Sequence, residues 1–152
     1  MLAQLSIKNY ALINDLTVVF GNGFTTITGE TGAGKSILLG GLSLVLGKRA
    51  DLSVQQDKSR KCIIEAEFAL GKYGLRSFFR ENELDYDPNT IIRREILPGG
   101  KSRAFINDTP VNLDVLSSLG IRLIDVHSQH QTLQLTDHDF QLKVVDALAD
   151  NK

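Results

Sequence analysis

The stretch Gly29-Glu30-Thr31-Gly32-Ala33-Gly34-Lys35-Ser36 decides the fold of this 152-residue chain. It matches all four fixed positions of the G-x-x-x-x-G-K-[ST] phosphate-binding loop. The apolar segment 24–28 precedes it and is predicted to be a strand, and the apolar segment 35–46 follows it and is predicted to be a helix. Because the motif binds phosphate in this strand–loop–helix context, the sequence predicts an α/β P-loop fold.

The residue types of the loop explain its chemistry. Glycine backbone takes conformations closed to other residues, so successive N–H groups can turn inward around an anion at the start of the helix. Lys35 adds a flexible positive charge, and the Ser36 hydroxyl can ligate Mg²⁺. A glycine-rich turn that only caps a helix is the alternative, and it would not need the lysine and serine together. The predicted nucleotide-binding residues are Gly29, Glu30, Thr31, Gly32, Ala33, Gly34, Lys35, Ser36 and Ile37.

Composition sets broad limits on function. The hydrophobic fraction of 42% and the charged fraction of 23% are typical of a globular domain. The net charge of −1 gives no overall basic footprint of the kind that dedicated DNA-binding domains carry. The single cysteine, Cys62, excludes an internal disulfide and is predicted to lie in the core. No apolar run has the length of a membrane span, so no membrane association is predicted.

Hydrophobic periodicity predicts the other elements. The Gly40–Gly41 pair inside the first helix suggests that this helix packs closely on the sheet. Antiparallel segments after the phosphate loop favour a mixed sheet beside an antiparallel sheet, with the nucleotide at their junction, over a simple alternation of parallel strands and helices. The uncapped last helix suggests a piece of a longer protein. The predicted elements are strands at 5–7, 16–20, 24–28, 62–70, 91–97, 102–107 and 121–126, and helices at 35–46, 75–82, 113–119 and 139–150.

The order of these motifs resembles the N-terminal lobe of an SMC/ABC-type ATPase head, most closely in the RecN family of bacterial DNA repair proteins. Five further stretches carry the resemblance together with the phosphate loop, and they extend it over nearly the whole chain. They are Leu5-Ser6-Ile7-Lys8-Asn9-Tyr10-Ala11-Leu12-Ile13, Leu46-Gly47-Lys48-Arg49-Ala50-Asp51, Arg93-Arg94-Glu95-Ile96, Gly100-Lys101-Ser102-Arg103-Ala104-Phe105-Ile106-Asn107 and Asp125-Val126-His127-Ser128-Gln129-His130-Gln131.

This resemblance implies a function for the longer protein. Residues 1–152 would form the N-terminal lobe of an ATPase head, with the coiled coil and the C-terminal lobe outside this sequence. The longer protein would bind ATP and Mg²⁺, hydrolyse ATP, and act on DNA in double-strand break repair and recombination. Its heads would pair around the nucleotide, and it would be cytoplasmic and associated with the nucleoid. Because the remaining catalytic motifs lie elsewhere, this lobe alone is expected to hydrolyse ATP negligibly.

The resemblance also assigns Gln129 as the Q-loop glutamine, which would contact Mg²⁺ and the attacking water. Lys35 and Gln129 are then the predicted catalytic residues, and Ser36 and Gln129 the predicted magnesium ligands. A neutral amide suits this role because its oxygen can ligate a hard cation without titrating near neutral pH.

Two other functions remain open from the sequence. In the first, the chain is a self-contained P-loop kinase or NTPase in which Asp125, at the end of the predicted strand 121–126, binds magnesium as a Walker B residue. In the second, it is an interaction module whose phosphate loop is vestigial. Arg49 either contacts DNA or couples two heads, as the resemblance allows, or is a solvated surface charge, and the basic cluster Lys58, Arg60 and Lys61 is predicted to be a solvated loop.

Overall fold

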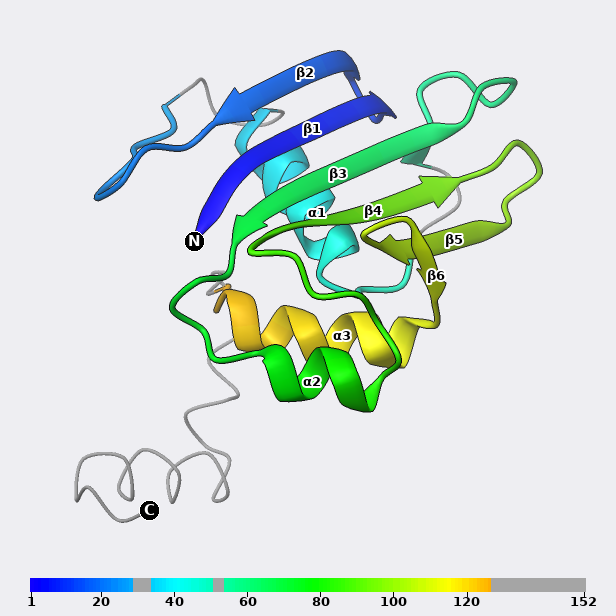
Figure 1. Ribbon diagram of the computed structural model, residues 1–152. Helices are drawn as coiled ribbons and strands as arrows, with labels where there is room; N and C mark the ends of the chain where they lie inside the picture. The colour runs from blue at the N-terminus through cyan, green and yellow to red at the C-terminus, as the bar shows by residue number, and fades with distance from the viewer. Residues whose placement is uncertain (29–33, 51–53, 127–152) are drawn as a thin grey trace, which may run out of the picture.

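The computed structural model describes residues 1–28, 34–50 and 54–126. In this part of the chain, six strands form one sheet and three helices lie against it (Figure 1). In chain order the elements are β1 (Leu2–Tyr10), β2 (Ile13–Val19), α1 (Gly34–Val45), β3 (Cys62–Ala69), α2 (Arg76–Glu81), β4 (Asn89–Ile96), β5 (Ser102–Ile106), β6 (Thr109–Val111) and α3 (Leu113–Leu123).

The strands follow the order β2-β1-β3-β4-β5-β6, and each described ladder is antiparallel. β5 and β6 form a tight hairpin. Its two-residue turn has left-handed backbone at Asn107 (φ 47°) and Asp108 (φ 64°), as such turns require. The described residues therefore form the predicted antiparallel sheet. They contain no parallel strand pair of the kind that the predicted mixed sheet would have.

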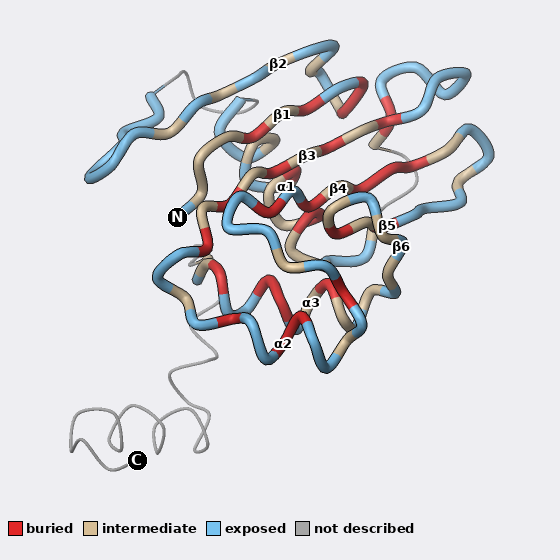
Figure 2. Tube along the Cα trace, viewed as in Figure 1, coloured by how far each residue is buried: buried red, intermediate tan, exposed pale blue. Residues whose placement is uncertain are grey.

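The sheet is buried on one face. Strict alternation along β3 buries Cys62, Ile64, Ala66 and Phe68 on one face (Figure 2). On β4 the same face carries the buried Ile92 and Ile96, although Glu95 is also buried near the end of this strand. This face is covered by the helices, so the apolar side chains pack into a single core. The prediction that Cys62 lies in the core is confirmed, since its side chain is fully buried.

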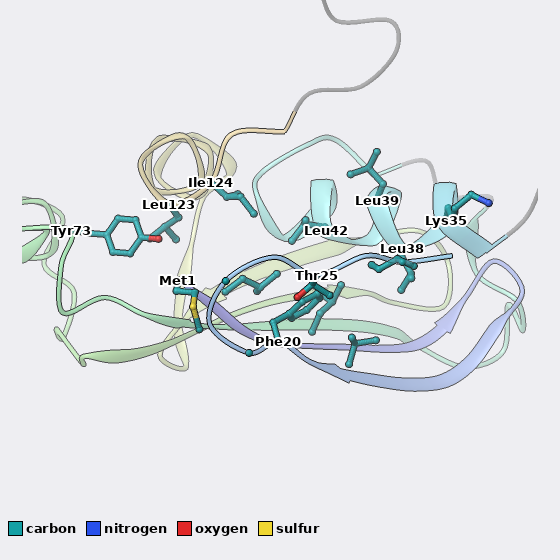
Figure 3. Close-up of a pocket in the computed structure, with 16 residues that line it drawn as sticks. Met1, Phe20, Thr25, Lys35, Leu38, Leu39, Leu42, Tyr73, Leu123 and Ile124 are labelled. Atoms are coloured by element: carbon teal, nitrogen blue, oxygen red, sulfur yellow. The ribbon is translucent and has the colours of Figure 1, made fainter. Parts of the chain in front are cut away.

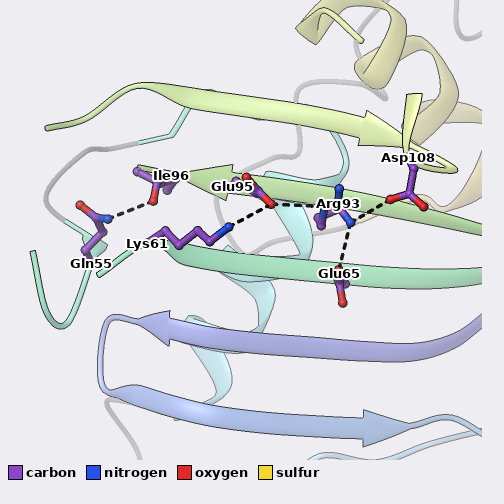
Figure 4. Close-up of polar contacts among 7 residues, drawn as sticks. All are labelled: Gln55, Lys61, Glu65, Arg93, Glu95, Ile96 and Asp108. Carbon is purple, nitrogen blue, oxygen red and sulfur yellow. Dashed lines mark hydrogen bonds and ion pairs between the residues drawn. The ribbon is translucent and has the colours of Figure 1, made fainter. Parts of the chain in front are cut away.

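The opposite face of the sheet is polar and crossed by ion pairs. Arg93 lies 2.9 Å from Asp108, 3.5 Å from Glu95 and 3.7 Å from Glu65 (Figure 4). Its guanidinium group also stacks on the Phe105 ring. Charged side chains at these register-matched positions keep this face in contact with solvent.

Two predicted strands are wrong. Residues 24–28 form no strand, and Phe24 is 95% exposed. A strand needs a hydrogen-bonding neighbour, and β2, the edge strand before this segment, pairs only with β1 among the described residues. Residues 121–126 are not a strand either, because α3 continues to Leu123 and Ile124 caps it. Leu123 is buried while Ile121 is 78% exposed, which is a helical rather than an extended pattern.

The helix predicted at 35–46 is present as α1, but it is not buried all round. Only Gly41, Leu44 and Val45 are fully buried, and Leu39 is 38% exposed. The helix predicted at 139–150 lies outside the described residues. No helix within the described ranges is long and apolar enough to cross a membrane.

Candidate functional site

The first turn of α1 carries the end of the phosphate-binding motif. The helix begins at Gly34, and Lys35 and Ser36 follow it with exposed side chains. The first N–H groups of a helix have no partner within the helix and form the positive end of its dipole. The first turn contains no acidic residue that would neutralise this end. The geometry therefore offers an exposed, positively polarised site next to a lysine and a hydroxyl.

Close packing fixes the position of α1 on the sheet. A Cβ atom added at Gly41 would lie 2.8 Å from the Ile7 Cδ1 atom, and one added at Gly40 would lie 2.7 Å from the Tyr10 hydroxyl oxygen. Real Cβ atoms do not approach other atoms this closely. The predicted reason for the glycine pair, close contact between helix and sheet, is confirmed.

An apolar groove of about 580 Å³ runs along α1 away from this turn (Figure 3). Leu38, Leu39 and Leu42 of α1 form one wall, and Lys35 marks one end with its ammonium group pointing out of the groove. The other contributions come from Met1, Leu2, Leu5, Val18, Phe20, Gly21, Gly23, Thr25, Ile27, Tyr73, Leu123 and Ile124. This lining suits apolar groups, so the chemistry for phosphate lies at the Lys35 end and not along the groove.

The predicted site residues divide into two sets. Gly34, Lys35, Ser36 and Ile37 are described, and Ile37 packs partly buried against the core. Gly29, Glu30, Thr31, Gly32, Ala33 and Gln129 lie outside the described residues. The conformation of the loop and the contacts of Gln129 therefore remain predictions.

The kinase-like interpretation of Asp125 loses its structural basis. That interpretation requires Asp125 at the end of a buried strand, but Asp125 is exposed and comes two residues after α3 ends. The backbone at the cap residue Ile124 is extended (φ −153°, ψ 140°), although Ile124 joins no sheet ladder among the described residues.

The basic residues Lys58, Arg60 and Lys61 lie in an exposed loop that two amides hold in place. The Asn9 side chain donates to the carbonyl oxygens of Asp57 and Arg60, both at 2.9 Å. The Gln55 side chain donates to the carbonyl oxygen of Arg60 at 3.0 Å. It also donates to the carbonyl oxygen of Ile96 at 3.0 Å (Figure 4). The loop is thus fixed to the ends of β1 and β4, and Lys61 is 3.8 Å from Glu95.

Sequence reasoning missed two features near these elements. The groove along α1 was hidden because its walls come from segments far apart in the chain. The second feature is Arg94, which is 2% exposed on the helix-covered face of β4. The alternation of Ile92, Arg94 and Ile96 was the signal that would have placed this arginine inward.

Comparison with known proteins agrees with this architecture. Residues 4–143 match the protein family described as AAA domain. The DNA repair protein RecN of Vibrio cholerae is 45% identical over 150 residues, which cover 98% of this chain and 27% of that protein. RecN of Xylella fastidiosa strain 9a5c is 39% identical over 153 residues, covering 100% of this chain and 28% of that protein. The chain thus spans about a quarter of the length of these relatives.

Solved structures show the same fold. A structure of SMC ATPases, described by its ATP-driven dimerization and DNA-stimulated activation, has a TM-score of 0.68 at 17% identity, covering 97% of this chain and 98% of that chain. The recombination mediator protein RecF with ATP has a TM-score of 0.56 at 16% identity, covering 73% of this chain and 27% of that chain. The P-loop NTPase fold of an SMC-like head lobe is confirmed. The chain therefore belongs to the AAA domain family, and nearly its whole length is similar to a part of the RecN DNA repair proteins.

Proposed function

We propose that residues 1–152 are the ATP-binding N-terminal lobe of a RecN-like ATPase head. The observation that carries this proposal is the phosphate-loop sequence leading directly into α1, whose first turn presents Lys35 and Ser36 to solvent. The positive end of this helix and the Lys35 ammonium group provide the charge that a polyphosphate requires. The first turn of α1 contains no acidic residue that would offset the positive end of the helix.

Each predicted residue has a stated role in this proposal. The loop from Gly29 to Gly34 supplies N–H donors to the phosphates, and Lys35 neutralises the negative charge that develops during transfer. The Ser36 hydroxyl and the Gln129 amide oxygen would hold Mg²⁺, and Gln129 would orient the attacking water. Bound Mg²⁺ polarises phosphate oxygens, which lowers the barrier to phosphoryl transfer to water.

We also propose the role of the longer protein. The relatives are named as DNA repair proteins, and the SMC neighbour is described by ATP-driven dimerization and DNA-stimulated activation. We therefore infer that the longer protein carries a coiled coil and a C-terminal lobe after this segment. It would pair two heads around ATP, bind DNA in double-strand break repair and recombination, and act in the cytoplasm at the nucleoid.

Calorimetric titration with Mg·ATP tests the nucleotide site. The 152-residue chain is expected to release saturable binding heat, and Lys35→Ala is expected to abolish it without altering the circular dichroism spectrum. Lys48→Ala is the matched control, because it removes an exposed lysine just beyond the other end of α1. Absence of heat from the unmodified chain would favour an interaction module with a vestigial loop.

A turnover assay tests the assignment to a head lobe. The chain alone is expected to hydrolyse ATP negligibly, because the residues of the C-terminal lobe and of a second head are missing. Robust hydrolysis that Lys35→Ala removes would contradict the lobe interpretation and favour a self-contained NTPase.

A further inference from the structure

Arg94 is the most deeply buried charge in the described part of the chain. Its side chain lies on the helix-covered face of β4, between the fully buried Ile92 and Ile96. Arg93, its neighbour, points to the opposite face and meets three carboxylates there. The two consecutive arginines therefore occupy opposite environments, one paired and solvated, the other enclosed.

The guanidinium group of Arg94 is only partly satisfied. Its Nη2 donates to the Ser102 hydroxyl at 3.2 Å, and its buried Nε has no hydrogen-bond partner among the described residues. No carboxylate in the described ranges forms an ion pair with it. Burial lowers the pKa of Arg94, but an arginine keeps its proton in a protein, so a full positive charge remains enclosed. A buried charge of this kind requires a counter-charge.

A cavity of about 460 Å³ lies beside this group, at the β5–β6 edge of the sheet. Arg94, Ser102, Arg103 and Leu113 contribute to its wall, and the wall contains two arginines and no carboxylate. The cavity is far larger than the roughly 30 Å³ that one water molecule occupies in the liquid.

The start of α3 adds a second source of positive potential. Asn112 lines the cavity and caps this eleven-residue helix, its side-chain oxygen accepting the Val115 N–H at 2.9 Å. That bond satisfies one of the first N–H groups and leaves those of Leu113 and Asp114 without helical partners. The Asp114 side chain is exposed and does not line the cavity.

We propose that this cavity is a binding site for a small oxyanion, either a phosphate or a carboxylate group, with Arg94 as its principal ligand. A guanidinium group matches two oxygens of either group in a bidentate arrangement. Ser102 also lines the cavity, and its hydroxyl, which accepts from the Arg94 Nη2 group, orients Arg94 and would contribute to the site. The cavity shares no lining residue with the groove that ends at Lys35, and no described residue of the phosphate-loop motif lines it.

Nuclear magnetic resonance of the ¹⁵N-labelled chain provides a test that reports on location. The measurements are made on the Lys35→Ala variant, in which phosphate binding at the P-loop is expected to be lost. Sodium phosphate and sodium acetate are titrated separately against sodium chloride at constant ionic strength and pH. We expect saturable shifts of the Arg94 Nε–H resonance and of the Ala104, Asn112 and Leu113 amides. Saturation by phosphate alone, or by acetate alone, identifies which of the two oxyanions the site accepts.

Substitutions test the ligand assignment. Arg94→Gln is expected to abolish the saturable shifts, and Ser102→Ala to raise the dissociation constant about fivefold, as for the loss of one hydrogen bond. Arg80→Gln is the matched control, because it removes an exposed arginine on α2 and should leave the affinity unchanged. If Arg94→Gln does not fold, the Arg94 Nε–H resonance and Ser102→Ala decide the matter. The proposal would be overturned if the shifts fail to saturate. It would also be overturned if Ser102→Ala and the Arg80→Gln control have the same dissociation constant for the anion.

Discussion

Single glycines set how closely the helices of this lobe approach each other. A Cβ atom at Gly120 of α3 would lie 2.7 Å from the Leu46 carbonyl oxygen and 3.1 Å from the Leu46 Cα atom. Both are backbone atoms, which cannot move aside as the end of a flexible side chain can. The contact between α3 and the end of α1 therefore depends on the absence of a side chain at this position.

We predict that Gly120→Ala destabilises the chain by about 1–3 kcal/mol, the usual cost of overpacking a core. Alanine is the better helix former by about 1 kcal/mol, so propensity alone predicts a gain. Urea denaturation would measure the difference. Gly71→Ala is the control, because a Cβ atom there meets nothing within 4 Å and the backbone is not left-handed. Equal stability of Gly120→Ala and the unmodified chain would contradict the close packing.

The buried thiol of Cys62 gives a second prediction at this scale. Burial raises the pKa of Cys62 to about 11 from a reference value of 9.0. The folded chain therefore favours the neutral thiol, and its contribution to stability is complete below pH 9 and is lost as the pH rises towards 11. We expect the free energy of unfolding to fall more steeply across this window in the unmodified chain than in Cys62→Ala.

Urea denaturation at several pH values between 9 and 11 would check the sign. Val45→Ala is a suitable control, because it also removes buried apolar atoms but keeps the thiol. It should be less stable at every pH with the same slope as the unmodified chain. A slope for Cys62→Ala that matches the unmodified chain would show that the thiol does not contribute.

Most residue assignments that depend on local pattern could be made from the sequence. The inward position of Cys62 follows from alternation along one strand, and the glycine pair of α1 signalled a close contact. The environment of Arg94 could not be inferred so simply, because its cavity is built from β5, β6 and the start of α3 as well. Whether a buried arginine meets a carboxylate depends on how strands that are separated in the chain pair with each other.

At the scale of elements, α3 depends on its N-cap. The Asn112 side chain accepts the Val115 N–H, and the basic Arg122 lies in the last turn, where it complements the helix dipole. We predict that Asn112→Ala lowers the free energy of unfolding by about 1 kcal/mol. Thermal denaturation followed by circular dichroism would measure this loss. Asn112→Asp, which keeps a capping oxygen, should retain most of the stability, and an equal loss in both variants would argue against capping.

The two wrong strand predictions share a cause. Apolar runs at 24–28 and 121–126 have strand-like composition, but composition does not supply a neighbouring strand. The first run finds no ladder in the described residues, and most of the second completes a helix that covers the core with Leu123. β3, which has strong internal periodicity, was predicted well because alternation specifies its buried face directly.

At the scale of the whole lobe, the helices cover one face of the sheet and leave a long apolar groove beside α1. Its volume is in the range of small-molecule sites, and its wall includes the partly exposed Leu39. We predict that the folded chain binds a hydrophobic fluorescent dye such as anilinonaphthalene sulfonate in this groove. Leu39→Lys is expected to weaken binding at least several-fold by placing a charge in the wall.

Fluorescence titration would measure the dye affinity, with circular dichroism to confirm that each variant is folded. Ile121→Lys is the matched control, since it changes an apolar residue that is 78% exposed and outside the groove. It should bind the dye as the unmodified chain does. Equal weakening in both variants would indicate nonspecific binding to exposed apolar surface.

The close packing of Gly40 and Gly41 on the sheet affects the end of α1 that carries Lys35. Gly40 lies five residues beyond Lys35, about 7.5 Å along the helix axis, at a point where α1 packs closely on the sheet. A larger residue at Gly40 or Gly41 would either push aside the end of the Tyr10 or Ile7 side chain or move α1 away from the sheet, and in the second case Lys35 would move with the helix. The phosphate-binding sequence would then be unchanged, yet the position of its lysine would depend on two glycines that lie outside that sequence.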